Sequence, residues 1–571
     1  MIIRFVFFYC FVQLSLLIPG YVVVRNSRIF VKKSGLELSF AYIASLVFLG
    51  LLATIGYVFR ISPTFLQTVG WLCLIAGVVV FVRQKLYRDL YVFRFPLLCF
   101  MLMSLLSCAF VSLSFPAKYS YLPDPSILSS RNYDVLNVKV LNLSQTQAND
   151  NYVPYRQAQF FINRSDPGND CFICEWGVGF FQRTPLMGAI TAGYFTVLND
   201  KPPVDYLWSS KSHDPSHTYA KFQVLAQVLN ALFIIPAFYL LSAMFKKRTA
   251  MVSCLLLIGS PFFLYNAVFS WPKSLVAFFV LVMWLLLLQK RLRYTVLAGV
   301  VGGLAYLTHD LAVFYIVASI GLLLYHRRFR DIFVLGGISA LIAFPWLVVS
   351  SLIYKKPSTF ALYPLSLHGL PQPGQSKAIV NEFLHTSPLE IISIRFDTLF
   401  YLLSPYDLIY STGGQSILKR IWAVGIFSIP GSLGFGLIIP VLLGAIKRIK
   451  GLDFWILVLI PVLMAAGIVG WRGSRAIASL HFAQAVVVLL TGLGVAYLVK
   501  LNSRLWLLAA FFANTLQLLF VIFYSHPGVG YTWFKNLSNI ACLGIIGGVV
   551  GVSGFMMFRI AYRKPALVVE S

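Results

Sequence analysis

Apolar runs of about 20 residues recur along most of this 571-residue chain, and each is long enough to cross a bilayer as a helix. Apolar residues make up 59% of the sequence and charged residues only 11%, which is too little polar surface for a soluble protein of this size. The sequence therefore predicts an all-α polytopic membrane protein. A soluble enzyme, a coiled coil and a disordered scaffold are excluded.

We place fifteen crossings on these runs. They cover residues 1–24, 37–59, 64–82, 95–115, 223–245, 250–270, 272–289, 294–308, 310–325, 332–354, 421–446, 454–470, 479–499, 505–524 and 538–558. Two long polar insertions, residues 116–222 and 355–418, interrupt them.

The net charge of +27 orients these crossings. With the N-terminus outside, eight short cytoplasmic connections hold 25 of the 46 basic residues and only five acidic ones, so that side carries +20. This asymmetry is the one expected of cytoplasmic loops. The charge therefore reports orientation and not a nucleic-acid partner, and both insertions fall outside.

Two stretches need this charge argument to be divided into crossings. Residues 294–325 are long for one crossing, but a single crossing would put the basic cluster that follows them outside. Two crossings leave His309 and Asp310 in a turn slightly below the outer surface. Residues 250–289 are also divided into two crossings, because prolines break the run and basic clusters flank both of its ends. This division leaves Lys273 at the outer interface.

The first insertion contains a segment with helical periodicity. Tyr155, Ala158, Phe161 and Ile162 fall on one face of a helix, and Asp150 stands at or just before its N-terminus. Asp150 is either an N-cap of a helix lying along the membrane surface or a functional carboxylate. Spacing alone favours the cap.

Further ionisable residues on the outer side are candidates for binding or catalysis. Arg183 precedes an apolar segment and would meet either lipid headgroups or a lipid-linked phosphate. Asp134 is a second acidic candidate. Lys273 either extends to the headgroups or has a functional role, and His309 and Asp310 either satisfy each other or act on a ligand. What favours function is that separate segments place all these groups on one side.

Six of the eight cysteines lie inside apolar runs, where we expect small core residues. Cys171 and Cys174 lie in a polar stretch. With no second pair and no histidine cluster nearby, a local disulfide or two free thiols is favoured over a zinc site.

Three short elements, in this order, resemble the GT-C superfamily of polytopic glycosyltransferases that use polyprenyl-phosphate-linked sugars. The chain is most similar to bacterial proteins of the protein mannosyltransferase and aminoarabinose transferase type. The elements are Asp150-Asn151 with Tyr155 and Ala158, then Thr184-Pro185-Leu186, and finally Leu307-Thr308-His309. The chain departs from the family at Asn151, where a second acidic residue is common, and at His309, which replaces a permanently charged residue.

The resemblance implies a GT-C-like helical bundle with two extracytoplasmic loop regions. We divide the chain into N-terminal transmembrane helices (1–94), a core that includes the large loop (95–355), a second loop (356–420) and C-terminal transmembrane helices (421–571). In the second loop, Tyr363, His368 and His385 are candidates for covering an acceptor.

The implied activity is transfer of a hexosyl or pentosyl unit, with inversion, from a polyprenyl-phosphate-sugar donor to a lipid, glycan or protein acceptor. The expected location is a bacterial plasma membrane, at its extracytoplasmic face, with the C-terminus cytoplasmic. Asp150 is the expected base with Asp134 in reserve, and Lys273, His309, Arg183 and Asp310 form the expected donor-phosphate site. The sequence does not decide whether a divalent metal is required.

Two other functions remain as alternatives. A transporter or flippase of lipid-linked sugars would carry charges in the middle of several helices, whereas this chain confines nearly all of them to the interfaces. An O-antigen ligase or polymerase would have its major loop late in the chain, whereas here the larger insertion comes first.

Overall fold

The fold comes from a computed structural model, which describes most of the chain. The described residues are 2–30, 34–112, 114–116, 140–142, 153–164, 171–173, 178–180, 184–200, 217–268, 272–353, 362–367, 375–403, 433–469, 482–524 and 539–562.

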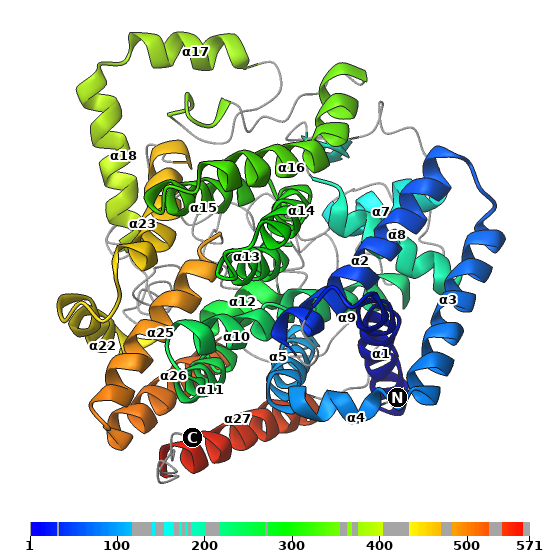
Figure 1. Cartoon of the computed structure of the whole chain (residues 1–571), viewed down its shortest axis with the longest axis horizontal. Helices are drawn as coiled ribbons and strands as arrows, with labels where there is room; N and C mark the ends of the chain where they lie inside the picture. Colours follow the sequence, from blue (N-terminus) through cyan, green and yellow to red (C-terminus); the bar gives the residue numbers. More distant parts are fainter. Residues whose placement is uncertain are drawn as a thin grey trace.

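Helices form almost all of the described elements (Figure 1). Before the first insertion they are α1 (Ile2–Ser27), α2 (Gly35–Val58), α3 (Pro63–Arg83), α4 (Tyr87–Leu90), η1 (Tyr91–Phe93) and α5 (Arg94–Ser112). The first insertion contains α7 (Val153–Asn163) and α8 (Leu186–Leu198). After it come α9 (His217–Ala231), α10 (Ile234–Met244), α11 (Lys247–Ile258), α12 (Pro261–Val268), α13 (Lys273–Leu287), α14 (Leu292–Thr308), α15 (Ala312–Tyr325), α16 (Phe329–Val348) and η8 (Val349–Ile353). The second insertion and the C-terminal part contain α17 (Ser376–His385), α18 (Pro388–Leu403), α22 (Phe435–Ile446), α23 (Leu452–Val469), α25 (Gln484–Lys500), α26 (Arg504–Tyr524) and α27 (Asn539–Tyr562).

The strands of the described residues are short and lie in the first insertion or at its start. β1 (Ser114–Pro116) pairs antiparallel with β2 (Val140–Asn142), and β3 (Cys171–Ile173) pairs antiparallel with β4 (Val178–Gly179). The expectation of an all-α membrane protein is therefore confirmed.

Every predicted crossing contains helix in its described part. Within the described residues, seven helical segments are long and apolar enough to cross a membrane, among them Gly35–Val58, Thr218–Met244 and Phe329–Ile353. Several others, such as α13, α14 and α15, are apolar but have 14 to 17 residues. The chain is thus a multi-pass membrane protein, and the count of fifteen stays a prediction.

Proline and the end of each apolar run explain where the helices break. The predicted crossing 223–245 is divided into α9 and α10, with Pro236 in the first turn of α10, where a missing N–H costs little. Pro261 begins α12 and Pro272 immediately precedes α13, as the sequence predicts.

The centre of the bundle is formed by helices buried on all sides. Every residue of α13 from Ser274 to Leu287 is buried. In the most apolar 18 residues of Thr218–Met244, 94% of the residues are buried as well. By contrast, only 22% of the residues in the most apolar part of α3 are buried, so this helix lies at the periphery. A helix apolar around its whole circumference is expected at such a centre.

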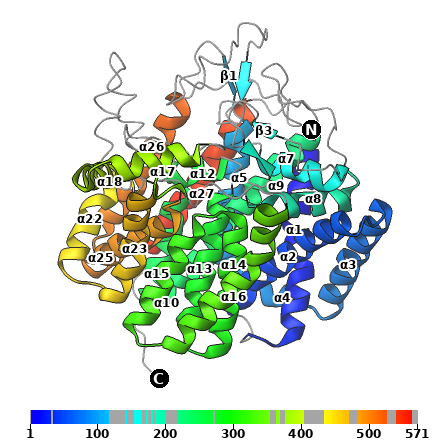
Figure 2. The same ribbon diagram turned by 90° about the horizontal axis from the view of Figure 1, so that it is seen from above.

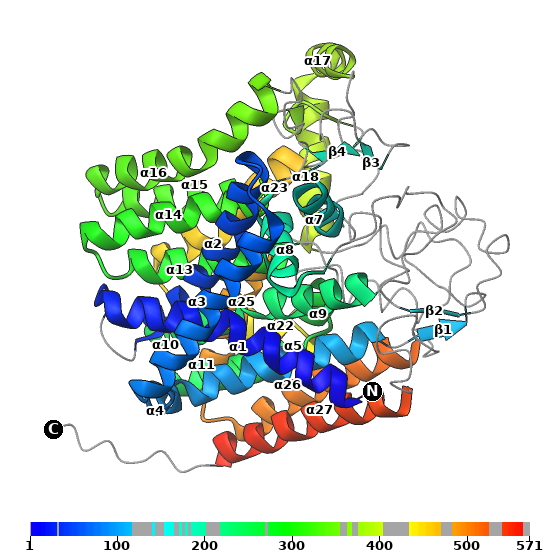
Figure 3. The same cartoon turned by 90° about the vertical axis from the view of Figure 1, so that its right-hand side faces the viewer.

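The start of α1 and the end of α27 lie at opposite ends of the bundle. Figures 2 and 3 show α1 beginning at the end that carries the strands and α7, whereas α27 finishes at the other end. This arrangement is the one expected from an odd number of crossings.

The expected burial of six cysteines is partly wrong. Cys99, Cys108, Cys254 and Cys542 are buried, but Cys10 and Cys73 are exposed on the faces of α1 and α3. The reason is that a residue in an apolar run of a membrane helix faces either the protein core or lipid, and both surroundings accept an apolar side chain.

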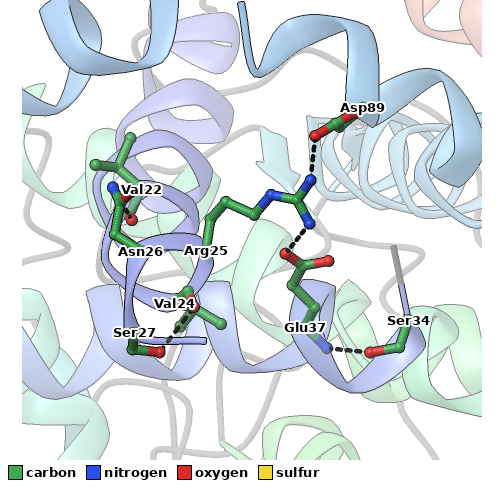
Figure 4. A network of polar contacts seen from close by, with 8 residues as sticks. All are labelled: Val22, Val24, Arg25, Asn26, Ser27, Ser34, Glu37 and Asp89. Atoms are coloured by element: carbon green, nitrogen blue, oxygen red, sulfur yellow. Dashed lines mark hydrogen bonds and ion pairs between the residues drawn. The ribbon is translucent and has the colours of Figure 1, made fainter. Parts of the chain in front are cut away.

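An ion-pair network joins the first helices at the end of the bundle that we assign to the cytoplasm (Figure 4). The Arg25 guanidinium on α1 lies 2.9 Å from a Glu37 oxygen on α2 and 2.6 Å from an Asp89 oxygen on α4. The Ser34 hydroxyl accepts a hydrogen bond from the Glu37 N–H and so caps α2. With Glu37 only 2% exposed, this guanidinium neutralises a buried carboxylate.

We expect Arg25→Ala to destabilise the protein by about 3 kcal/mol, because it removes the cation that serves two carboxylates. The exposed Arg28 nearby provides the control, and Arg28→Ala should change stability by less than about 0.5 kcal/mol. Thermal unfolding of the purified variants in detergent measures the difference. Equal melting temperatures for the two variants would contradict the role given to Arg25.

Candidate active site

Four segments that are distant in the sequence meet at one small pocket. The pocket is lined by Val153, Pro154 and Gln157 of α7, Thr184 and Met187 at the start of α8, Pro272 before α13, and Thr308, His309 and Asp310 between α14 and α15. It has room for about one water molecule in this conformation.

The helix predicted after Asp150 is present as α7. Tyr155 and Ala158 are buried, at 3% and 0% exposed, and Phe161 and Ile162 on the same face are half-buried. The Tyr155 ring packs edge-on against Tyr219 of α9, with 5.2 Å between the ring centroids. This apolar face fixes α7 to the bundle, so that its first turn lines the pocket.

On its other side α7 is held by aromatic rings from distant elements. Phe180 lies 5.3 Å from Phe160 and 5.8 Å from Trp346 of α16, measured between ring centroids. Ring contacts therefore link α7 directly to α9 and, by way of Phe180, to α16.

α8 is a buried helix that the sequence analysis assigned to the polar insertion. It begins directly after Pro185, as the proline predicts, and eleven of its thirteen residues are buried. A Cβ atom at Gly193 would lie 2.1 Å from the Leu49 carbonyl oxygen of α2, and one at Gly188 would lie 2.4 Å from the Gln157 Cβ of α7. Glycine at these two positions therefore allows α8 to pack against α2 and α7 at backbone distance (Figure 1).

The turn between α14 and α15 brings a histidine and a carboxylate together. His309 caps α14, and its Nδ1 lies 2.7 Å from Asp310 Oδ1 and 3.2 Å from the backbone N of Leu311. Nδ1 cannot accept a hydrogen bond from Leu311 while it carries a proton that it donates to Asp310. The proton on this ring therefore decides which partner Nδ1 binds.

Helix N-termini give the pocket an attraction for anions. Neither α8 nor α13 has a side-chain hydrogen bond at its N-cap, and α7 also begins at the pocket. The backbone N–H groups of a first helical turn and the helix dipole favour a negative charge at such ends. Lys273 is the first residue of α13 and is half-buried, so it adds a positive charge beside Pro272.

The predicted site residues divide into two groups. Lys273, His309 and Asp310 are described, and the turn that holds the last two lines the pocket. Asp150, Asp134 and Arg183 lie outside the described residues. Two residues close to them in the sequence line the pocket. Val153 follows Asp150 by three residues, and Thr184 directly follows Arg183.

Gln157 is a residue that the sequence analysis missed. Its side chain is 1% exposed, lines the pocket and donates a hydrogen bond of 3.4 Å to the Thr184 carbonyl oxygen. It thereby connects the first turns of α7 and α8. The available signal was a polar residue one place before Ala158, on the apolar side of a helix that otherwise buries aromatic rings.

The second insertion contributes no described residue to the lining. Tyr363 is buried, and His385 at the end of α17 is exposed with its Nδ1 2.7 Å from the Asn381 carbonyl oxygen. His368 lies outside the described residues. Within the described part of the chain, no group of three or more His, Cys, Asp or Glu side chains is placed to hold a metal ion.

We expect Gly188→Ala to destabilise the protein by about 1 to 3 kcal/mol, because the added methyl group would overlap Gln157 and force α7 away from α8. Gly337→Ala on α16 is the matched control, since a Cβ there meets nothing within 4 Å. Thermal unfolding of both variants tests this, and a Gly188→Ala protein as stable as the control would contradict the close packing.

The comparison with protein families identifies one segment of the chain. Residues 217–349 match the family model described as dolichyl-phosphate-mannose-protein mannosyltransferase. This segment extends from the start of α9 to the first residue of η8 and includes Lys273, His309 and Asp310. It does not include α7 and α8.

Among solved structures, the chain is similar to the crystal structure of the Archaeoglobus fulgidus oligosaccharyltransferase in complex with zinc and sulfate. The identity is 14% and the TM-score 0.40, and the alignment covers 67% of this chain and 49% of that one, so the chain matches about half the length of that protein. No curated protein matches the chain. The family match confirms the resemblance to the GT-C superfamily and supports a membrane glycosyltransferase.

Proposed function

We propose that this protein transfers a sugar from a polyprenyl-phosphate donor to a lipid, glycan or protein acceptor at the extracytoplasmic face of a bacterial plasma membrane. The observation that carries the proposal is the pocket at which the first turns of α7 and α8, the start of α13 and the 309–310 turn meet. Two of these segments lie inside the part that matches a mannosyltransferase family.

The donor phosphate is the ligand for which the cations near the pocket are suited. Lys273 and the uncapped start of α13 stabilise its negative charge, and His309 donates a hydrogen bond when protonated. Asp310 is itself anionic, so its place in this set is to hold His309 as a cation. Arg183 precedes α8 directly and supplies a guanidinium that matches a phosphate.

Asp150 is the proposed general base, with Asp134 in reserve. The base takes the proton of an acceptor hydroxyl while that oxygen bonds to the anomeric carbon of the sugar. The bond from this carbon to the phosphate oxygen breaks at the same time, and the polyprenyl phosphate departs with the electron pair. Attack from the face opposite the phosphate inverts the anomeric centre.

A transporter or flippase, or an O-antigen ligase or polymerase, would also use lipid-linked sugars. The distribution of charge favours the transferase, because nearly all ionisable residues lie at helix ends and loops instead of mid-helix. Transfer of a radiolabelled sugar from polyprenyl phosphate to acceptor by the purified protein separates these classes.

We expect Asp150→Asn to lower the rate of this transfer about a hundredfold or more while donor binding stays intact, because the amide cannot accept the hydroxyl proton. Lys273→Gln should instead raise the donor KM about tenfold, since it removes a phosphate contact. Asp453→Asn, an exposed carboxylate at the start of α23, is the control. A fully active Asp150→Asn enzyme would remove Asp150 from the base position.

We also expect fusion proteins to report the orientation given by the charges. Green fluorescent protein attached at the C-terminus should fluoresce, because it folds in the cytoplasm, and alkaline phosphatase inserted after residue 360 should be active, because that enzyme needs the extracytoplasmic side. Active alkaline phosphatase at the C-terminus would reverse the assignment of the pocket to the outer face.

A further inference from the structure

A second cavity lies on the other side of the α7 and α8 pair, away from the candidate active site. It is formed by the end of α2, the start of α3 and the C-terminal halves of α7 and α8, and has a volume of about 160 Å³. It shares no lining residue with the pocket at His309. Its walls are apolar and its rim is polar, and each restricts the chemistry of the ligand that the cavity can bind.

The walls are apolar. Ala53 of α2, Leu66 of α3 and Phe195 of α8 line the cavity together with Phe161 and Ile162 of α7. Ala53 and Ala192 also pack with Ala158 in a cluster of small residues, which leaves the space between the helices open. A wall of this kind suits an aliphatic chain.

The rim is polar and carries an excess of positive charge. Arg164 follows α7 and donates hydrogen bonds to the carbonyl oxygens of Arg60 and Ile61 in the α2–α3 turn. The Asp200 carboxylate at the rim is neutralised by Lys221, whose Nζ lies 2.7 and 2.9 Å from its two oxygens. Arg60 is itself exposed in this turn, so that among the described residues two arginines accompany the Asp200–Lys221 ion pair.

The cavity lies beside a helix that is exposed along most of its length. Phe65, Leu72 and Ile75 of α3 are 59%, 61% and 54% exposed, and these apolar side chains face lipid in a membrane-embedded bundle. A ligand can therefore enter from the bilayer between α2 and α3. Because the α2–α3 turn is at the same end of the bundle as α7, the rim lies near the outer headgroups.

We infer that this cavity binds an anionic phospholipid of the outer leaflet, with one acyl chain between α2, α3, α7 and α8 and the headgroup phosphate at Arg60 and Arg164. The inference does not depend on the proposed transferase activity. A lipid held here supports the C-terminal end of α7, whose first turn lines the candidate active site about 16 Å away along the helix.

Photo-crosslinking of the full-length protein in vesicles tests the inference. The probe is phosphatidylglycerol that carries a diazirine on one acyl chain, in a phosphatidylcholine background. We expect crosslinks to peptides that contain Phe161 and Phe195. Thr196→Phe, which fills the cavity, should reduce them to the level found without light, whereas Thr54→Phe on the exposed face of α2 should leave them unchanged.

A second variant tests the headgroup and does not disturb packing. Arg60→Gln at the exposed turn should lower the preference for phosphatidylglycerol over an equally labelled phosphatidylcholine about fivefold. Equal crosslinking by the two lipids in the wild type, or crosslinks that survive in a folded Thr196→Phe protein, would overturn the inference. Displacement of the probe by an equimolar amount of polyprenyl phosphate would also overturn it, because the cavity would then hold the chain of a lipid-linked sugar.

Discussion

Inside a hydrocarbon layer a backbone N–H or C=O must find its hydrogen-bond partner within its own helix, and this requirement shapes the whole molecule. The backbone groups inside a helix are therefore already paired. Backbone groups that can bind a ligand are found where helices begin and end. α13 is buried from Ser274 onward, yet its first residue is a lysine, directly after the Pro272 that lines the pocket. The candidate active site is a place where several such helix ends coincide, so its chemistry comes from the ends of otherwise apolar elements.

α8 is the helix that holds the other elements of the candidate active site in place. It is a short helix packed at backbone distance against α2 through Gly193 and against α7 through Gly188. Through these contacts the N-terminal helices, which lie outside the family-matching segment, position the loop elements that face residues 217–349. The family-matching core alone would lack two of the four walls of the pocket.

The sequence predicts the helical framework well, because apolar runs and prolines act locally. The break at Pro261 and the start of α13 after Pro272 follow from such signals, whereas the turn at His309 follows from the charge of the loop after it. Burial within the membrane is harder to predict, since lipid and protein core select the same residues, and the exposed Cys10 and Cys73 illustrate this. The packing of α8 depends on partners more than a hundred residues away, and the hydrogen bond from Gln157 to Thr184 depends on that packing. Neither could be read from local spacing.

The partly exposed helices α14 and α15 have 17 and 14 residues, which corresponds to about 21 to 26 Å, whereas the hydrocarbon core is about 30 Å thick. A bilayer around such helices must become thinner or let water reach below its usual surface. The His309 turn then sits at the bottom of a local depression in the leaflet at its end of the bundle. A phosphate that reaches it leaves the plane of its neighbouring headgroups and loses part of its hydration, so that the positive helix ends act on it through a medium of lower dielectric constant.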